Sequence, residues 1–158
     1  METRFDPRKS APEVYEAMLA LEAAVKATGL ESTLLDLVKL RASQVNGCAY
    51  CIDMHSKDLR AQGESEERLY LLNAWREAPF YSDRERAALA WTEAVTLVAE
   101  EHIPDEVYQQ ARQQFADGEL AKLTLAVVAI NGWNRFAIAF HAVPGKYKPR
   151  RKSEAAMT

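Results

Sequence analysis

Residues 120–140 read LAKLTLAVVAINGWNRFAIAF, a stretch in which apolar side chains would cover nearly every side of a helix. Such a helix has to be buried, either inside its own fold or against another subunit. It is not a membrane span, because its longest apolar run, Leu123 to Ile130, falls short of the ~18–20 residues that a span requires. We therefore expect a helix from Glu119 to about Ala142 that organises the core.

The rest of the chain carries the same helical periodicity, and no alternating β pattern competes with it. Apolar stripes, helix-ending glycines and prolines, and two capping boxes (Ser10 with Glu13, Ser82 with Glu85) mark further helices. These are expected over residues 10–29, 32–45, 48–62, 64–78, 82–100 and 104–118. The prediction is an all-α, single-domain bundle of about seven helices over residues 1–142, followed by a basic, poorly ordered tail over residues 143–158.

The composition is that of an ordinary soluble globular protein. Hydrophobic residues make up 48% of the 158 residues, charged residues 27%, and the net charge is −3. This balance argues against a nucleic-acid surface, and we expect neither a nucleic-acid nor a membrane partner. The first residues lack the apolar segment of a secretory signal, so a cytoplasmic location is expected. There, a CxxC pair is more often catalytic or metal-binding than a structural disulfide.

Both cysteines of the chain lie at the start of the third predicted helix, in the stretch NGCAYCIDMH of residues 46–55. At ~100° per residue, Cys48, Cys51 and His55 fall on one narrow face of that helix. The break at Asn46-Gly47 puts Cys48 in the first turn, where free N–H groups and the helix dipole stabilise a thiolate. His55 lies one turn beyond Cys51, within reach of its proton.

Three interpretations of this helix face are open. A zinc site would have three ligands here and would need a fourth or an open position, while His102 and His141 are isolated in the sequence. Two buried core cysteines beside an unrelated histidine are a second interpretation. The third is a redox dithiol for thiol–disulfide exchange or peroxide reduction, and the spacing favours it.

The run LLDLVKLRASQVNGCAYCIDMHSKDLRAQG of residues 34–63 resembles the AhpD-like alkyl hydroperoxidase core, within the carboxymuconolactone decarboxylase superfamily. The resemblance spans roughly residues 10 to 141, and its specific part is the CxxCxxxH motif. It implies an all-α fold assembled into homo-trimers or homo-hexamers. It also implies an enzyme whose CxxC pair acts on an organic hydroperoxide or a disulfide.

The resemblance also assigns roles by position. Cys51 would attack the peroxide, Cys48 would resolve the oxidised thiol, and His55 would belong to a proton relay. The family's relay glutamate, twelve residues before the first cysteine, corresponds to Asp36, which is one methylene shorter. Tyr50 stands where the best-studied members have a histidine between the cysteines. An external thiol reductant or reductase partner would restore the dithiol, and no nucleotide-binding glycine pattern suggests a bound cofactor.

Two functions of other classes stay open. One is a lyase acting on a carboxylated lactone, the superfamily's other chemistry, which needs no dithiol. The other is a non-enzymatic zinc-binding or interaction module. Asn134 and Arg135 interrupt the apolar helix and are expected to be paired, in an ion pair or an interface contact. A faint internal echo aligns Asn46-Gly47 with Asn131-Gly132.

Overall fold

The computed structural model describes residues 2–149, and every regular element within them is helical. The elements are α1 (Pro7–Ser10), α2 (Pro12–Lys26), α3 (Ser32–Val45), α4 (Ala49–Gln62), α5 (Glu66–Tyr70), the 3-10 helix η1 (Leu72–Ala74), α6 (Asp83–Thr96), α7 (Val98–Glu101), α8 (Asp105–Gln114) and α9 (Asp117–Ala139). The all-α prediction is confirmed for these residues. None of their helices is long and apolar enough to cross a membrane.

The prediction of about seven helices was too low, because nine α-helices lie within residues 2–149. The short helix α1 was not expected, and Asp6 accepts a hydrogen bond from the Arg8 N–H at its start. Leu97 leaves α-helical geometry (φ −98°, ψ 20°) and divides one expected helix into α6 and α7. A helix over 64–78 was also expected as one piece, and it divides into α5 and η1.

The capping predictions had mixed outcomes. Ser82 and Glu85 form the expected capping box at the start of α6. The box at Ser10 was wrong, because Ser10 ends α1 and Ala11 precedes α2 without a side-chain cap. Gly118 does not end a helix either, since it lies in the first turn of α9.

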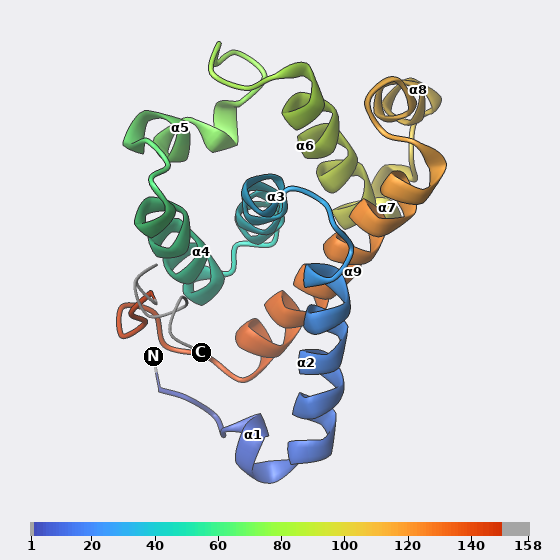
Figure 1. Ribbon diagram of the computed structural model, residues 1–158. Helices are drawn as coiled ribbons and strands as arrows, with labels where there is room; N and C mark the ends of the chain where they lie inside the picture. Colours follow the sequence, from blue (N-terminus) through green and yellow to red (C-terminus); the bar gives the residue numbers. More distant parts are fainter. Residues whose placement is uncertain (1, 150–158) are drawn as a thin grey trace.

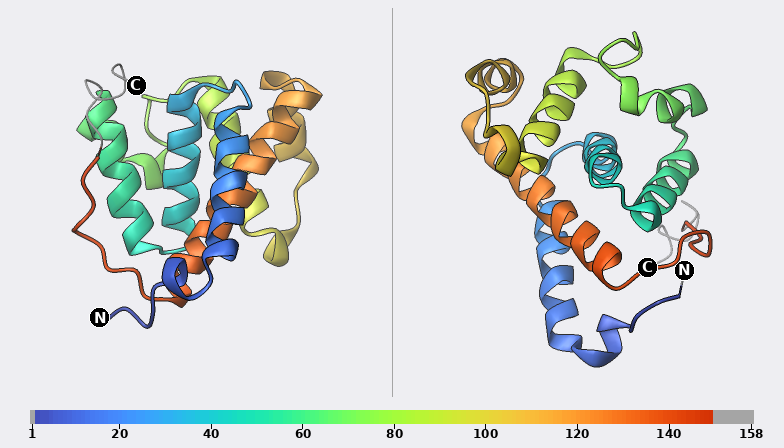
Figure 2. Two further views of the ribbon diagram at one scale, coloured as in Figure 1. Left: turned by 60° about the horizontal axis from the view of Figure 1, so that its bottom comes forward. Right: turned by 180° about the vertical axis from the view of Figure 1, so that it is seen from behind.

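Helices α3 and α9 form the centre of the molecule. Helix α3 packs against α4, α6 and α9, while α9 also packs against α2 (Figure 1). Figure 2 shows α9 and α2 side by side, with α3 between this pair and α4. On α9, Leu123 and Val127 are fully buried, whereas Val128 and Ile138 are 51% and 46% exposed. The expected burial of this apolar helix is therefore confirmed for one side of it.

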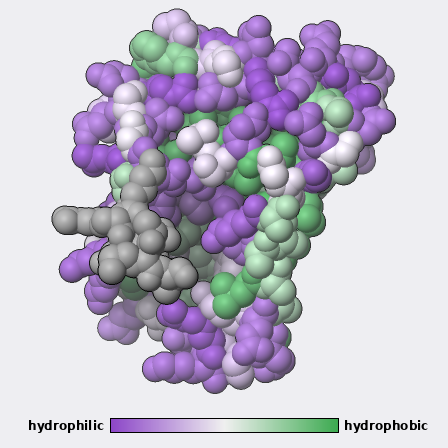
Figure 3. All heavy atoms as spheres, in the orientation of Figure 1, coloured by the Kyte–Doolittle hydropathy of each residue, from purple (hydrophilic) through white to green (hydrophobic). Residues whose placement is uncertain are grey.

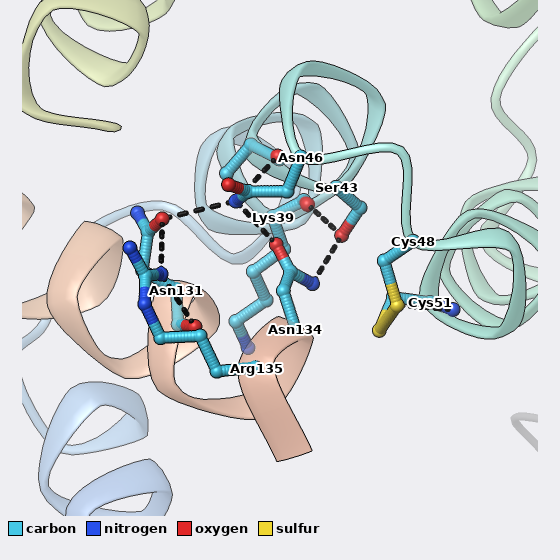
Figure 4. The surroundings of a disulfide bond; sticks show 9 residues. Lys39, Ser43, Asn46, Cys48, Cys51, Asn131, Asn134 and Arg135 are labelled. Atoms are coloured by element: carbon cyan, nitrogen blue, oxygen red, sulfur yellow. Dashed lines mark hydrogen bonds between the residues drawn. A yellow bond between two sulfur atoms is a disulfide. The ribbon is translucent and has the colours of Figure 1, made fainter. Parts of the chain in front are cut away.

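A polar cluster joins the end of α3 to the middle of α9 (Figure 4). The fully buried Asn134 donates from Nδ2 to Ser43 Oγ at 3.0 Å, and its Oδ1 accepts from Asn46 Nδ2 at 2.8 Å. Asn46 Nδ2 also donates to Asn131 Oδ1 at 2.9 Å. The two asparagines of the internal echo therefore touch each other. Arg135 is exposed and donates to Asn131, so it forms no ion pair within residues 2–149, and the expected interface contact stays a prediction.

We expect Asn134→Ala to lower the free energy of unfolding by about 2 kcal/mol. The substitution removes the donor to Ser43 Oγ and one acceptor of Asn46, and it leaves a small void between α3 and α9. Urea unfolding followed by circular dichroism measures the change. Lys122→Ala, at an exposed position of the same helix, is the control and should change the value by less than about 0.5 kcal/mol.

Candidate active site

Cys48 and Cys51 are joined by a disulfide at the start of α4, with their Cα atoms 5.4 Å apart. Cys48 is the N-cap residue of α4, and its Sγ accepts a hydrogen bond from the Cys51 N–H at 3.4 Å. The turn before it depends on Gly47, whose φ of +65° would strain a residue with a side chain. The Cys48 N–H then donates to the Ser43 carbonyl at 2.9 Å, which fixes the turn against the end of α3.

The local environment favours negative charge on a sulfur once the pair is reduced. The amide of the first helical turn already points at Cys48 Sγ, and the positive end of the helix dipole adds to it. Both cysteines are at most 2% exposed in the disulfide form. A small molecule can therefore reach the pair only through an opening in the surrounding side chains.

A pocket of about 830 Å³ provides that opening, and we call it the thiol pocket. It lies between α4 and α2, where the space-filling view shows a hollow beside the apolar side chains of α2 (Figure 3). Cys51 lines the thiol pocket, together with Tyr50, Met54 and His55. Cys48 is not among its lining residues, so Cys51 is the sulfur that a substrate in this pocket meets.

A second group of side chains that lines the thiol pocket is aromatic. These side chains come from α2, from α9 and its C-cap, and from the segment before α1: Phe5, Tyr15, Trp133, Phe136 and Phe140. Tyr15 and Trp133 meet edge to face, with ring centroids 5.2 Å apart. Trp75 and Trp91 pack in the core, where they are 4% and 6% exposed. Trp133, by contrast, is only partly buried and lines the thiol pocket.

The side chain of His55 is buried, and the residue is 7% exposed. Within residues 2–149, its Nε2 is the one buried side-chain nitrogen or oxygen atom without a hydrogen-bond partner. Burial, and secondarily the positive charge of Lys39, lowers the pKa of His55 to about 3. In the disulfide form the imidazole is therefore neutral at physiological pH, with a ring nitrogen unused. Such a nitrogen can accept a proton or a hydrogen bond from a thiol or from a peroxide.

A buried ion pair lies beside this imidazole. Lys39, 5% exposed on α3, donates to Glu22 of α2 at 2.6 Å, and both side chains line the thiol pocket. The pairing satisfies one N–H of the ammonium group and compensates part of its desolvation. The pocket therefore contains a paired ammonium and carboxylate group, and the ammonium group acts on His55.

The structure places Asp36 in the thiol pocket but toward its far end. Asp36 Oδ2 accepts from Gln62 Nε2 at 2.8 Å, and Gln62 is the last residue of α4. Eleven residues separate Gln62 from Cys51, which corresponds to ~16 Å along the helix. The bend at residues 46–47 does bring α3 back alongside α4, as a relay would need. The charge of Asp36 also acts on another carboxyl of the pocket, that of Asp58.

Asp58 lies between His55 and Gln62 on the pocket side of α4. Its Oδ1 accepts a hydrogen bond from the Tyr147 hydroxyl at 2.7 Å. Burial raises the pKa of the Asp58 carboxyl; the negative charge of Asp36 adds to the rise, and the Tyr147 hydrogen bond opposes it. Two carboxyl groups on one pocket wall therefore repel each other, and Asp58 gives up its proton less readily.

Residues 143–149 form the first part of the expected C-terminal tail, and they lie along α4. Asp53 Oδ2 accepts from the Gly145 N–H at 2.9 Å, and Lys57 Nζ donates to the Tyr147 carbonyl at 3.2 Å. Lys146 and Tyr147 line the thiol pocket as a result. The remaining part of the expected tail, residues 150–158, lies outside the described residues.

The structure brings all four candidate residues, Cys48, Cys51, His55 and Asp36, to one region, although their roles stay predictions. It adds Lys39, which sequence reasoning missed, and Asp58 and Tyr147. Asp58 had a usable signal, because it is seven residues after Cys51 and shares its helix face. No group of three or more metal-binding side chains lies close enough to hold an ion within residues 2–149.

Comparisons with known proteins identify relatives of this chain. The sequence profile of the carboxymuconolactone decarboxylase family matches residues 12–94, a segment that includes α2, α3 and α4. The uncharacterized protein YdfG of Bacillus subtilis strain 168 is 42% identical over 139 residues, which are 88% of this chain and 95% of YdfG.

Solved structures share the fold over most of the chain. A protein of unknown function from Agrobacterium tumefaciens, described as a candidate AhpD antioxidant defence protein, is 44% identical with a TM-score of 0.89. The match covers 92% of this chain and 100% of that one. The debrominase Bmp8 matches with a TM-score of 0.77 and 18% identity over 87% of this chain and 74% of its own. At that identity the likeness to Bmp8 concerns the fold alone.

Proposed function

This chain belongs to the carboxymuconolactone decarboxylase family, and on that premise we propose that it is a dithiol peroxidase that reduces organic hydroperoxides. One observation carries the proposal: the cysteines form a disulfide, and Cys51 of that pair lines the thiol pocket next to His55. The description of the Agrobacterium tumefaciens relative as a candidate AhpD antioxidant defence protein agrees with it.

In the proposed reaction the Cys51 thiol gives its proton to His55, whose Nε2 is unpaired and whose ring is neutral. The Cys51 thiolate attacks the peroxide, the O–O bond breaks, and the sulfur becomes a sulfenic acid while an alcohol leaves. Cys48 then displaces water from the sulfenic acid and forms the disulfide. The amide that points at Cys48 Sγ favours the thiolate needed for that second attack.

The disulfide must be reduced again for a second turnover. We propose an external thiol reductant or a reductase partner, with no cofactor bound to this chain. The cycle requires a reducing compartment, so we propose the cytosol as its place of action.

We also propose that the protein works as a homo-oligomer. Two neighbouring helices expose large apolar side chains that a second copy would cover: Val14 and Leu19 on α2, and Val128 and Ile138 on α9. Each of these four is more than 40% exposed in the single chain. Exposed apolar surface of this kind is typical of protein–protein contacts.

The test is a direct assay of the reduced protein with cumene hydroperoxide and tert-butyl hydroperoxide. We expect one peroxide to be consumed per subunit without reductant, together with the loss of two free thiols. With dithiothreitol present, consumption should continue over many turnovers. The double variant Cys48→Ser/Cys51→Ser should consume no more peroxide than buffer does.

The same pair of proteins separates the proposal from a lyase. Decarboxylation of a carboxylated lactone needs no thiol, so a lyase would act equally well in the double variant. Peroxide loss that is independent of both cysteines, or thiols that survive excess peroxide, would overturn the proposed function.

A further inference from the structure

We propose that Asp58, held in place by Tyr147, exchanges protons with His55 and carries the Cys51 proton between the buried site and the open part of the thiol pocket. This inference rests on the proposed function and deepens it. Asp58 acts through His55 and is therefore a positioning and proton-exchange residue. It is an alternative to Asp36, whose carboxylate accepts a hydrogen bond from Gln62 at the end of α4.

The geometry of α4 supports a stepwise path. Cys51, His55 and Asp58 occupy positions zero, four and seven, so they lie within about 60° of each other around the helix. His55 lies ~6 Å and Asp58 ~10 Å along the axis from Cys51. Each successive pair has the three- or four-residue spacing at which side chains are neighbours. All three side chains line the thiol pocket.

A carrier is needed because the site is closed around the sulfur. Cys51 is 2% and His55 7% exposed, so neither exchanges protons freely with solvent. A charged imidazole would be poorly solvated there and would face the ammonium group of Lys39. A proton accepted by His55 therefore has to move on, and Asp58 is the next group on that helix face with partial access to solvent.

The groups around Asp58 adapt it to this task. Helix α3 presents Asp36 and Lys39, α2 presents Lys26, and the C-terminal segment presents Tyr147. Burial and the Asp36 charge raise the pKa of Asp58, and the hydrogen bond and the two ammonium groups oppose the rise. A carboxyl whose pKa lies above its usual range accepts a proton more readily from imidazolium.

The Tyr147 hydroxyl adds a geometric constraint. It donates to Oδ1 of Asp58, so the proton can reside on Oδ2. In the ionisation step, the S–H bond of Cys51 breaks, Nε2 of His55 gains that proton, and Asp58 gains the proton that the ring releases. In the attack, the sulfur electron pair forms the S–O bond and the O–O electron pair leaves on the alkoxide. The alkoxide receives the proton back by the reverse path, so thiol and hydroperoxide become sulfenic acid and alcohol.

The test compares Asp58→Asn, Tyr147→Phe and Asp53→Asn. Asp53 is the matched control, because it binds the same C-terminal segment through Gly145 but does not line the thiol pocket. Single-turnover peroxide reduction is measured from pH 4 to pH 8. The wild type and Asp53→Asn should lose rate as the pH falls through the pKa of Asp58.

We expect Asp58→Asn to be about 10-fold slower at neutral pH and to lack that acid limb. Added formate or imidazole should restore part of its rate, which a merely structural defect would not allow. Tyr147→Phe should move the limb to higher pH, because it removes a hydrogen bond that favours the carboxylate. An Asp58→Asn profile that matches Asp53→Asn would overturn the inference.

A second readout does not depend on peroxide. In the Cys48→Ser background only Cys51 remains, and its alkylation by iodoacetamide reports the fraction of thiolate at each pH. With Asp58 present, the profile should contain an additional inflection at a lower pH than the inflection of the thiol, and with Asp58→Asn this additional inflection should be absent. If the wild type fails to reduce peroxide, the proposed function is wrong. If Asp58→Asn leaves the alkylation profile of Cys51 unchanged, only the proposed role of Asp58 is wrong.

Discussion

Cys51→Ser is expected to lower the rate of peroxide reduction by roughly 10³-fold or more, because it removes the nucleophile itself. Cys51 is the cysteine that lines the thiol pocket, so it is the sulfur that a peroxide reaches first. Cys48 Sγ has the helix amide as its partner, which favours its thiolate but gives the substrate no access. Accessibility to peroxide therefore determines which cysteine attacks, because a thiolate that peroxide cannot contact does not react.

Cys48→Ser is the matched variant, and we expect it to retain the first reaction. It should consume one equivalent of peroxide per subunit at close to the wild-type rate, and then hold Cys51 as a sulfenic acid. Dimedone labelling followed by mass spectrometry should find the adduct on Cys51 in Cys48→Ser and none in the wild type. The wild type escapes labelling because its disulfide forms first.

The reverse pattern would contradict the assignment. A burst that survives in Cys51→Ser and disappears in Cys48→Ser would make Cys48 the attacking thiol. The pocket would then have to open toward the N-cap of α4 before peroxide could enter.

The sequence was sufficient to predict those parts of the site that depend on local structure. The spacing of Cys48, Cys51 and His55 determines their common helix face wherever α4 is placed. The Asn46-Gly47 break was equally readable, because glycine is the residue that adopts the left-handed conformation of such a turn. The boundaries of α3 and α4 followed from the same kind of local signal, whereas the signals at Ser10 and Gly118 were misleading.

Long-range contacts could not be read from the sequence. Asp36 was assigned by its place before the first cysteine, but where it lies depends on how α3 returns along α4. The contact between Tyr147 and Asp58 joins residues 89 positions apart. Lys39 has the sequence pattern of a solvated helix lysine, and only the approach of Glu22 on α2 allows its burial. Charged residues that pair across helices leave no periodic signal.

His55 gives the second large expected effect, in this case on stability. Its pKa is lowered to about 3 in the folded disulfide form, against 6.5 for an ordinary histidine. Below pH 6.5 the unfolded chain therefore binds a proton that the folded chain refuses. Stability falls as the pH falls between these values, at about 1.4 kcal/mol per pH unit. From pH 6 to pH 4 His55 alone should remove about 2.5 kcal/mol from the free energy of unfolding.

Urea unfolding of the oxidised protein at pH 7, 6, 5 and 4 measures this slope, and His55→Gln isolates the contribution of the imidazole. Carboxyl groups with lowered pKa values, such as Glu31 bonded to Arg84, add a slope of the same sign. They are present in both proteins, so the difference between the two slopes belongs to His55. His102→Gln, which replaces an exposed histidine, is the control for the histidine-to-glutamine change itself. Equal slopes in wild type and His55→Gln would show that the folded protein accepts the proton after all.

The redox state supplies the link between this measurement and the chemistry. In the disulfide form no negative charge on sulfur compensates the burial of an imidazolium ion. In the reduced form a thiolate at Cys51, one turn away, would favour the charged ring and raise the pKa of His55. The acid slope should therefore be smaller for the reduced protein in dithiothreitol than for the oxidised protein. A slope that does not respond to reduction would mean that His55 does not sense the charge on Cys51, and the proton transfer proposed between them would lose its basis.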